Sequence, residues 1–328
     1  MTKNPKVTVF GAGVWGSVLA QHLAKKGCPV TLWEHFPHLL HEIEKHGRQH
    51  PHIPHFKFEP EITLTSSLEE AASAEFFVLA ISSKAARHFA QSLERHLKTA
   101  IPLASASKGL EEETGFTVCE IIEDAAPKLR GMTMALSGPS FALEVARGVP
   151  TKLLLAGPDN SLLEQACSVL DGFPLRVETS PDRRGVEWAG AAKNVFAIAC
   201  GMADGNPRLG ANTRAALLTQ AVKEMSLIIT AAGGRAETAQ SLASLGDLML
   251  TGTNEISRNH KLGVKLAQGK ALAQARGEID TVTEGADAAE AVFRLAQAKR
   301  LDAPLAAAMR KILREAAPPE TLLKALGF

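Results

Sequence analysis

The chain has 328 residues, 45% of them hydrophobic, which is enough for two domains of roughly 150 residues each, with real cores. Its 36 Lys and Arg residues nearly balance its 35 Asp and Glu residues and no long block carries one sign, which excludes a general polyanion-binding surface. Tyrosine is absent and aromatic residues total 5%, which argues against base-stacking platforms, so we expect no nucleic-acid partner.

The N-terminal residues lead directly into a short apolar stretch, without the apolar segment and cleavage site of a secretory signal. The longest apolar run, near residues 195–203, is far below the ~18 residues that a membrane span requires. The four cysteines, Cys28, Cys119, Cys167 and Cys200, lack CxxC spacing, which fits reduced thiols. We therefore expect a soluble, cytoplasmic protein with no stable membrane insertion.

Short apolar runs, most of them separated by segments of helical spacing, predict a mainly parallel sheet with helices on its faces. These runs are residues 6–10, 29–33, 62–65, 76–81, 101–106, 132–136, 152–156 and 175–177. After about Pro181, strand signals almost vanish and Ala/Leu-rich helical segments continue to Phe328.

The predicted fold class is therefore α/β, with an N-terminal domain built on a mainly parallel sheet followed by an all-α C-terminal domain. We place the first domain at residues 1–185 and the second at residues 186–328. The second is the expected substrate-binding and catalytic domain. We expect the active site in the cleft between them.

Gly11, Gly13 and Gly16 form a G-x-G-x-x-G pattern between the first predicted strand and a helix predicted over residues 17–26. In that context the first glycine allows a tight turn, the second lets backbone N–H groups approach a pyrophosphate, and the third lets helix and strand pack closely. The pattern predicts that the N-terminal domain is a Rossmann-like dinucleotide-binding domain. The alternative is a glycine-rich turn that binds nothing.

Glu34 and His35 follow the second predicted strand, where a dinucleotide-binding fold places the residue that reads the ribose. A carboxylate can accept from a 2′-hydroxyl and repels a 2′-phosphate, whereas a protonated histidine favours the phosphate. The sequence does not show which side chain points inward, so the choice between NAD and NADP stays open.

Seven of the eleven histidines fall between His35 and His55, interrupted by prolines. Their spacing matches no zinc motif, so we interpret them as solvated loop histidines and predict no metal site.

Lys193 lies in an otherwise apolar, Ala/Gly-rich helical run over residues 186–202. A lysine there is either buried for a functional reason or extends outward to water, and the run alone does not decide. Farther on, a helix with Ser257 as its N-cap would gather the cations Arg258, His260 and Lys261 in its first turn, against the helix dipole, unless an anion such as phosphate binds there. The alternative is an earlier start, capped by Thr253 or Asn254.

Together these residues make the chain resemble the bacterial type of NAD(P)-dependent glycerol-3-phosphate dehydrogenase, over nearly its full length. The resemblance rests on Gly11-Ala-Gly-x-x-Gly16, Trp33-x-His35, Ser107-Lys108-Gly109-Leu110-Glu111, Ser137-Gly-Pro-Ser140-Phe-Ala142, Gly190-Ala-Ala-Lys193-Asn194, Leu245-Gly-Asp247-Leu, Ser257-Arg258-Asn259 and Glu284-Gly285.

The resemblance implies hydride transfer between NAD or NADP and the C2 centre that joins dihydroxyacetone phosphate to sn-glycerol 3-phosphate, a precursor of phospholipids. It implies Lys193 as the proton donor and acceptor. The substrate-binding residues it implies are Lys108, Gly138, Ser140, Lys193, Asp247, Ser257, Arg258 and Asn259. The cofactor-binding residues it implies are Gly11, Gly13, Val14, Trp15, Gly16, His35, Lys108, Ala142, Arg258, Val282 and Glu284. A homodimer is compatible with it.

Glu34 departs from the resemblance, because these enzymes often have a small or uncharged residue there. Two other functions stay open. The β-hydroxyacid and 6-phosphogluconate dehydrogenases share a fingerprint domain followed by a helical domain with a lysine, but here Asn194 follows Lys193 directly. A non-catalytic dinucleotide sensor would need only the fingerprint, and the polar residues of the second half speak against it.

Overall fold

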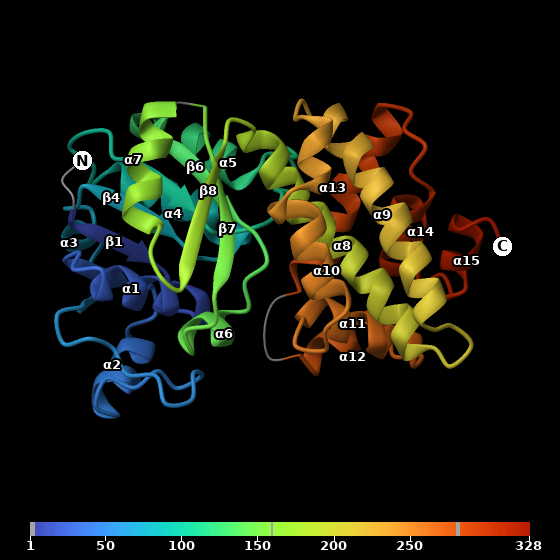
Figure 1. Cartoon of the computed structure of the whole chain (residues 1–328), viewed down its shortest axis with the longest axis horizontal. Coiled ribbons are helices and arrows are strands. Elements are labelled where there is room, and N and C mark those ends of the chain that lie inside the picture. The colour runs from blue at the N-terminus through green and yellow to red at the C-terminus, as the bar shows by residue number, and fades with distance from the viewer. Residues whose placement is uncertain (1–3, 159, 280–282) are drawn as a thin grey trace. The chain divides into compact units, whose positions relative to one another are not determined.

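The computed structural model describes residues 4–158, 160–279 and 283–328 (Figure 1). The chain divides into two compact units, each treated by itself below. The first comprises Met1–Ser107, Val118–Leu136 and Ser140–Arg183; the second comprises Lys108–Thr117, Ser137–Pro139 and Arg184–Phe328. The second unit thus includes two short excursions of the N-terminal half of the chain. The domain bounds 1–185 and 186–328 stay a prediction.

The first unit is built on one eight-stranded sheet in the order β3-β2-β1-β4-β5-β6-β7-β8. The strands are β1 (Val7–Phe10), β2 (Val30–Trp33), β3 (Thr63–Thr65), β4 (Phe76–Leu79), β5 (Leu103–Ser105), β6 (Thr133–Ser137), β7 (Thr151–Ala156) and β8 (Leu175–Ser180). Each strand overlaps a run predicted from the sequence, although β8 continues three residues beyond its run. The pairs from β3 through β6 and the pair β7–β8 are parallel. The predicted parallel sheet is therefore confirmed.

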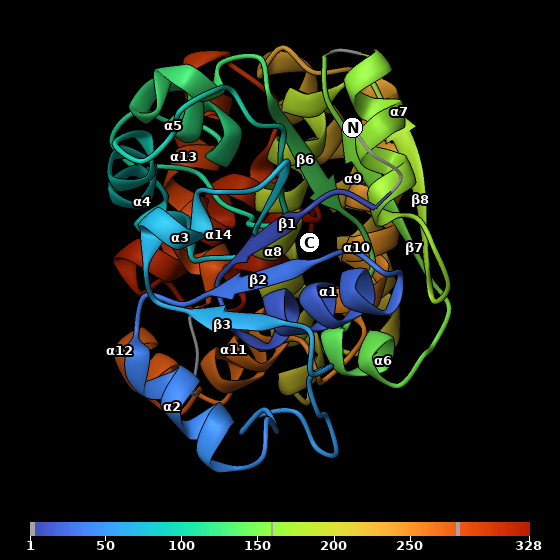
Figure 2. The ribbon, with the colours of Figure 1, turned by 90° about the vertical axis from the view of Figure 1, so that its left-hand side faces the viewer.

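The central strands β1 and β4 are fully buried, because helices cover the sheet on its faces. The α-helices of this unit are α1 (Val14–Lys25), α2 (Pro37–Lys45), α3 (Leu68–Ala71), α4 (Ala86–Glu94), α5 (Val118–Ala125), α6 (Ala142–Ala146) and α7 (Asn160–Leu170). Figure 2 shows α1 beside α6, and α4 beside α5. Helix α1 begins three residues before the predicted start at residue 17, because Gly13 has extended backbone angles and serves as its N-cap.

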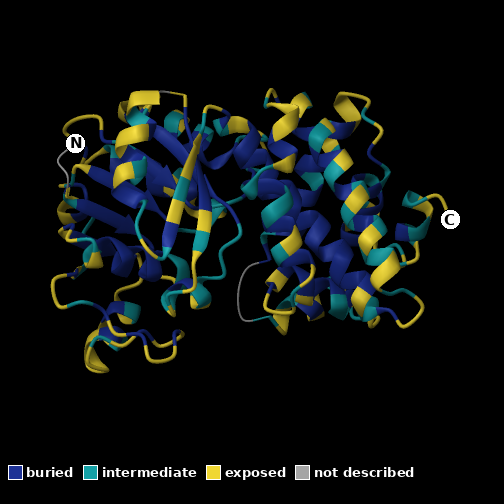
Figure 3. Ribbon diagram, viewed as in Figure 1, coloured by how far each residue is buried: buried dark blue, intermediate teal, exposed yellow. Residues whose placement is uncertain are grey.

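The second unit is helical. Its α-helices are α8 (Arg183–Gly205), α9 (Ala211–Ala231), α10 (Asp247–Gly252), α11 (Arg258–Ala267), α12 (Leu272–Gly277), α13 (Glu284–Ala298), α14 (Pro304–Glu315) and α15 (Thr321–Ala325). Helix α8 is buried over nearly its whole length, as its dark blue ribbon in Figure 3 shows. Lys193 is among its buried residues. Within the described residues, neither α8 nor any other helix combines the length and apolarity needed to cross a bilayer.

Glycines allow α8 and α11 to pack with their backbones in contact. A Cβ on Gly201 of α8 would collide with the carbonyl oxygen of His260, and one on Gly263 of α11 would collide with that of Ile198. Small residues permit such close approach because they add no side-chain bulk between the helices. This packing fixes Lys193, on α8, relative to the residues at the start of α11.

Candidate active site

The glycine turn between β1 and α1 has the geometry that a dinucleotide requires. Gly11 has a φ of 104°, and a Cβ there would lie 2.6 Å from the carbonyl oxygen of Ala80. A Cβ on Gly16 would collide with the carbonyl oxygen of Gly11, whereas one on Gly13 would meet nothing within 4 Å. Two glycines are therefore required by packing inside the protein, and Gly13 leaves open space beside the turn.

The N-terminus of α1 follows this open space. Val14 and Trp15 are its first residues, Gly13 provides no side-chain cap, and the first turn contains no acidic residue. The unpaired N–H groups and the positive end of the helix dipole suit an anion. The turn therefore fits the pyrophosphate of NAD or NADP.

The segment after β2 faces this turn with a carboxylate. The Glu34 side chain is buried and accepts a hydrogen bond from the Ala12 N–H, at 2.8 Å. His35 is exposed, and its ring contacts those of Trp33 and Phe36, with centroids 6.1 and 4.8 Å apart. The structure thus decides the question that the sequence left open, namely which of the two neighbours points inward.

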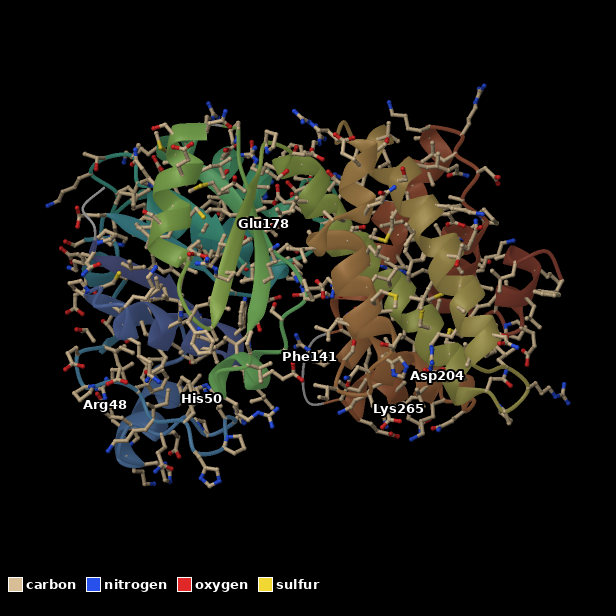
Figure 4. All side chains as sticks on the ribbon, in the orientation of Figure 1. Arg48, His50, Phe141, Glu178, Asp204 and Lys265 are labelled. Carbon is tan, nitrogen blue, oxygen red and sulfur yellow. The ribbon has the colours of Figure 1, made fainter. Side chains whose placement is uncertain are left out.

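The histidine-rich segment is only partly as predicted. Six of its histidines are exposed, but His38 and His41 lie on helix α2 and not in a loop, and the interpretation as solvated loop histidines is also wrong for His50, which is 3% exposed (Figure 4). Its Nε2 lies 3.0 Å from the Ala12 carbonyl oxygen, and its Nδ1 accepts from the His52 N–H. Burial lowers the pKa of His50. His50 therefore acts as a structural contact to the glycine turn.

In the second unit, Lys193 forms part of a buried cluster with Asp247 and Lys108. The Lys193 Nζ lies 3.1 Å from Asp247 Oδ1, and the Lys108 Nζ donates to Asp247 Oδ2 at 2.6 Å. Lys193 and Asp247 are 5% and 3% exposed, whereas Lys108 is 20% exposed. The structure thus shows Lys193 buried and paired, as the functional interpretation of the sequence requires.

Local features of the backbone bring this cluster together. Gly190 lies one turn before Lys193, and the Lys108 side chain lies against α8 there, since a Cβ on Gly190 would be in van der Waals contact with it at 3.5 Å. Asp247 follows a turn of π-helix, Leu242–Gly246, a conformation found frequently at functional sites. Gly138 has a φ of 140°, which favours glycine.

The charges in the cluster shift one another's titration. Burial lowers the pKa of Lys193 to about 8; the Asp247 carboxylate acts to raise it and Lys108 to lower it further. Burial acts to raise the pKa of Asp247, but Lys108 and Lys193 outweigh that effect and hold the pKa below its ordinary value. Lys193 can therefore gain and lose a proton near physiological pH while Asp247 stays ionised.

Helix α11 begins as predicted. The Ser257 hydroxyl accepts from the His260 N–H at 3.3 Å, so Ser257 is the N-cap. The alternative start is wrong, because Thr253 donates to the Met249 carbonyl and Asn254 accepts from the Ile256 N–H.

Arg258, at the first position of α11, is exposed, and Asn259 is buried with its Oδ1 accepting from the Gly285 N–H. The imidazole of His260 contacts Asp204 at the end of α8, with 2.8 Å between Nε2 and Oδ2; Asp204 is labelled in Figure 4. This contact was not predicted. The sequence signal for it was weak: the helical spacing of His260 with Val264 and Ala267 places His260 on an apolar face of the helix.

The other predicted residues are divided between the two units. Ser140 precedes α6 in the first unit, and Ala142 is the first residue of α6. Glu284 begins α13 in the second unit, where burial raises its pKa and Arg258 opposes that rise. Val282 lies outside the described residues. Among the described residues, no group of three or more His, Cys, Asp or Glu side chains could hold a metal ion.

Two family models match the chain, and together they cover both units. The N-terminal model of NAD-dependent glycerol-3-phosphate dehydrogenase matches residues 6–163, and the C-terminal model matches residues 182–324. The chain belongs to the NAD-dependent glycerol-3-phosphate dehydrogenase family.

Curated members of this family support the assignment. The glycerol-3-phosphate dehydrogenase [NAD(P)+] of Geobacter metallireducens is 40% identical over 315 residues, 95% of this chain and 94% of the relative. That of Maridesulfovibrio salexigens is 37% identical over 317 residues, 96% of each chain. The crystal structure of glycerol-3-phosphate dehydrogenase from Coxiella burnetii matches with a TM-score of 0.91 and 31% identity over 99% of both chains. The predicted family is confirmed.

Proposed function

We propose that this member of the glycerol-3-phosphate dehydrogenase family interconverts dihydroxyacetone phosphate and sn-glycerol 3-phosphate with NAD(P)H. The names of its relatives support this activity. The observation that carries the chemistry is the buried Lys193 ammonium beside Asp247. sn-Glycerol 3-phosphate is a precursor of phospholipids, and we propose that the enzyme supplies it for phospholipid synthesis in the cytoplasm. None of its four cysteines, all of which are described, forms a disulfide, which suits a reducing compartment.

The proposed mechanism assigns proton transfer to Lys193. When bound, the nicotinamide supplies or accepts the hydride at C2 of the substrate. As the ketone becomes an alkoxide, the Lys193 Nζ–H donates a hydrogen bond to the developing oxyanion and then transfers its proton to that oxygen. In the reverse direction, neutral Lys193 accepts the hydroxyl proton as the hydride leaves C2. Asp247 keeps the Nζ in place in both directions.

The site residues are also proposed for binding. For the substrate they are Lys108, Gly138, Ser140, Lys193, Asp247, Ser257, Arg258 and Asn259. For the dinucleotide they are Gly11, Gly13, Val14, Trp15, Gly16, His35, Lys108, Ala142, Arg258, Val282 and Glu284. The open space beside Gly13 supports the pyrophosphate contact.

The start of α11 supports the phosphate contact. Arg258 and Lys261 are exposed in its first turn, which contains no acidic residue of its own; the nearby acid is Glu284 at the start of α13, which interacts with Arg258. A phosphate at this end would receive helix N–H groups and two N–H groups from one guanidinium. We therefore propose that Arg258 binds the phosphate of the substrate.

The activity is tested by measuring initial rates of NADH and NADPH oxidation with a panel of ketones. We expect turnover with dihydroxyacetone phosphate and little with unphosphorylated dihydroxyacetone. Activity confined to unphosphorylated hydroxy- or ketoacids would reject the proposal and favour a β-hydroxyacid dehydrogenase. Coenzyme binding without turnover of any ketone would favour a sensor.

In the same assay, Arg258→Ala should raise KM for dihydroxyacetone phosphate by about 10- to 100-fold, since a charge-assisted contact contributes roughly 1.5–3 kcal/mol. Arg208→Ala is the matched control, because Arg208 is exposed in the turn between α8 and α9. An unchanged KM for Arg258→Ala would remove Arg258 from the phosphate site.

A further inference from the structure

Glu34 is held against the glycine turn by two hydrogen bonds. Its Oε2 accepts from the Ala12 N–H at 2.8 Å, and its Oε1 accepts from the Phe36 N–H at 3.1 Å. The side chain is only 9% exposed. The carboxylate is therefore fixed next to Ala12, which lies between Gly11 and Gly13.

The turn itself is held from the opposite side of the same residue. The His50 ring lies against the Ala12 carbonyl oxygen, while Glu34 receives the Ala12 N–H. Because His50 Nδ1 accepts from a backbone N–H, its proton is on Nε2 and the ring is neutral. His50 thus fixes the turn without adding a positive charge beside Glu34.

Arg48 and His35, two further basic residues of the segment after β2, make other contacts. Arg48 donates to the carbonyl oxygens of Glu59 and Ile62. His35 is exposed and its ring contacts Trp33 and Phe36. Of the two side chains that the structure places on Ala12, Glu34 and His50, Glu34 is therefore the charged one.

This geometry has opposite consequences for the two coenzymes. Each Glu34 oxygen accepts one hydrogen bond and keeps a lone pair, so the carboxylate can also accept from a ribose hydroxyl. A 2′-phosphate in the same position would bring a second anion close to a buried carboxylate that two N–H groups hold in place. Moving the carboxylate away would break both of those hydrogen bonds.

We propose that Glu34 makes this enzyme select NADH over NADPH. The inference rests on the proposed function in one respect, namely that the glycine turn binds a dinucleotide. It adds a residue that decides between the two coenzymes.

The test is equilibrium binding of NADH and NADPH to the full-length protein by titration calorimetry, without substrate. We expect NADH to bind at least ~10-fold more tightly than NADPH, since two unit charges a few ångströms apart near a protein surface cost that much or more. In Glu34→Gln, NADPH binding should tighten by about 10-fold while NADH binding changes little, because the amide loses the charge and still accepts from one N–H.

Two further variants keep the test decisive. Glu44→Gln removes the same charge from an exposed position on α2 and should leave both affinities unchanged. Glu34→Asp keeps the charge and should keep the preference for NADH, even if Glu34→Gln does not fold. If the wild type bound NADPH as tightly as NADH or more tightly, the inference would be overturned while the proposed function stood. The same would follow if the ratio of NADH affinity to NADPH affinity were unchanged in Glu34→Gln. Binding of neither coenzyme would overturn the proposed function with it.

Discussion

Replacing Lys193 with alanine is expected to lower kcat for the reduction of dihydroxyacetone phosphate by about 10³- to 10⁴-fold. The reason is that the variant lacks both the hydrogen-bond donor for the oxyanion and the source of the proton. NADH affinity should be almost unchanged, since Lys193 is not among the residues proposed to bind the dinucleotide, and the glycine turn and Glu34 belong to the other unit. Stopped assays for the residual rate and calorimetry for NADH binding measure the two quantities separately.

The alanine variant should fold. Asp247 keeps its bond to Lys108, so the carboxylate is not left unpaired in the interior. Lys223→Ala is the matched control, because Lys223 is exposed on α9 in the same unit. Turnover of Lys193→Ala at the wild-type rate would remove this residue from the mechanism.

Replacing Asp247 with asparagine is expected to lower both the stability of the helical unit and the rate of ketone reduction. Removing one partner of a buried ion pair typically costs about 3–5 kcal/mol, and here one carboxylate serves two lysines. Because Asp247 acts to raise the pKa of Lys193, its loss should lower that pKa further. Less of Lys193 is then protonated at neutral pH, and the donor form becomes scarcer.

The effect on the pKa of Lys193 distinguishes a role of Asp247 in tuning Lys193 from a purely structural role. Thermal unfolding measures the stability loss, and the pH dependence of kcat/KM for reduction should shift to lower pH in Asp247→Asn. Asp302→Asn, at an exposed position between α13 and α14, should alter neither quantity. A variant with lowered stability but an unshifted pH profile would show that Asp247 does not tune Lys193.

The parts of the site that follow from local chemistry could be predicted from the sequence. The glycine turn is one, because its three glycines have separate steric roles within six residues. The Ser257 cap is another, because the hydroxyl bonds an N–H only three residues along the chain. The strands could be placed because buried parallel strands are short, continuous apolar runs.

The contacts that join distant segments could not be predicted in this way. Lys108 and Asp247 are 139 residues apart, and nothing local indicates that their side chains meet. Glu34 and His35 are adjacent, so which one faces the turn depends on how the chain leaves β2. His50 lies in a proline-rich loop typical of solvated segments, yet it folds back on Ala12, 38 residues earlier.

The pH dependence of kcat/KM in both directions tests most directly the claim that Lys193 exchanges the proton. Since burial lowers the Lys193 pKa to about 8, reduction, which needs the protonated amine, should be constant below that pH and fall above it. Oxidation needs the neutral amine, so its rate should rise up to about pH 8 and then level off. Two limbs of opposite sign with a shared midpoint near 8 would support the account. Profiles of the same sign, or a midpoint near that of an ordinary lysine, would contradict it.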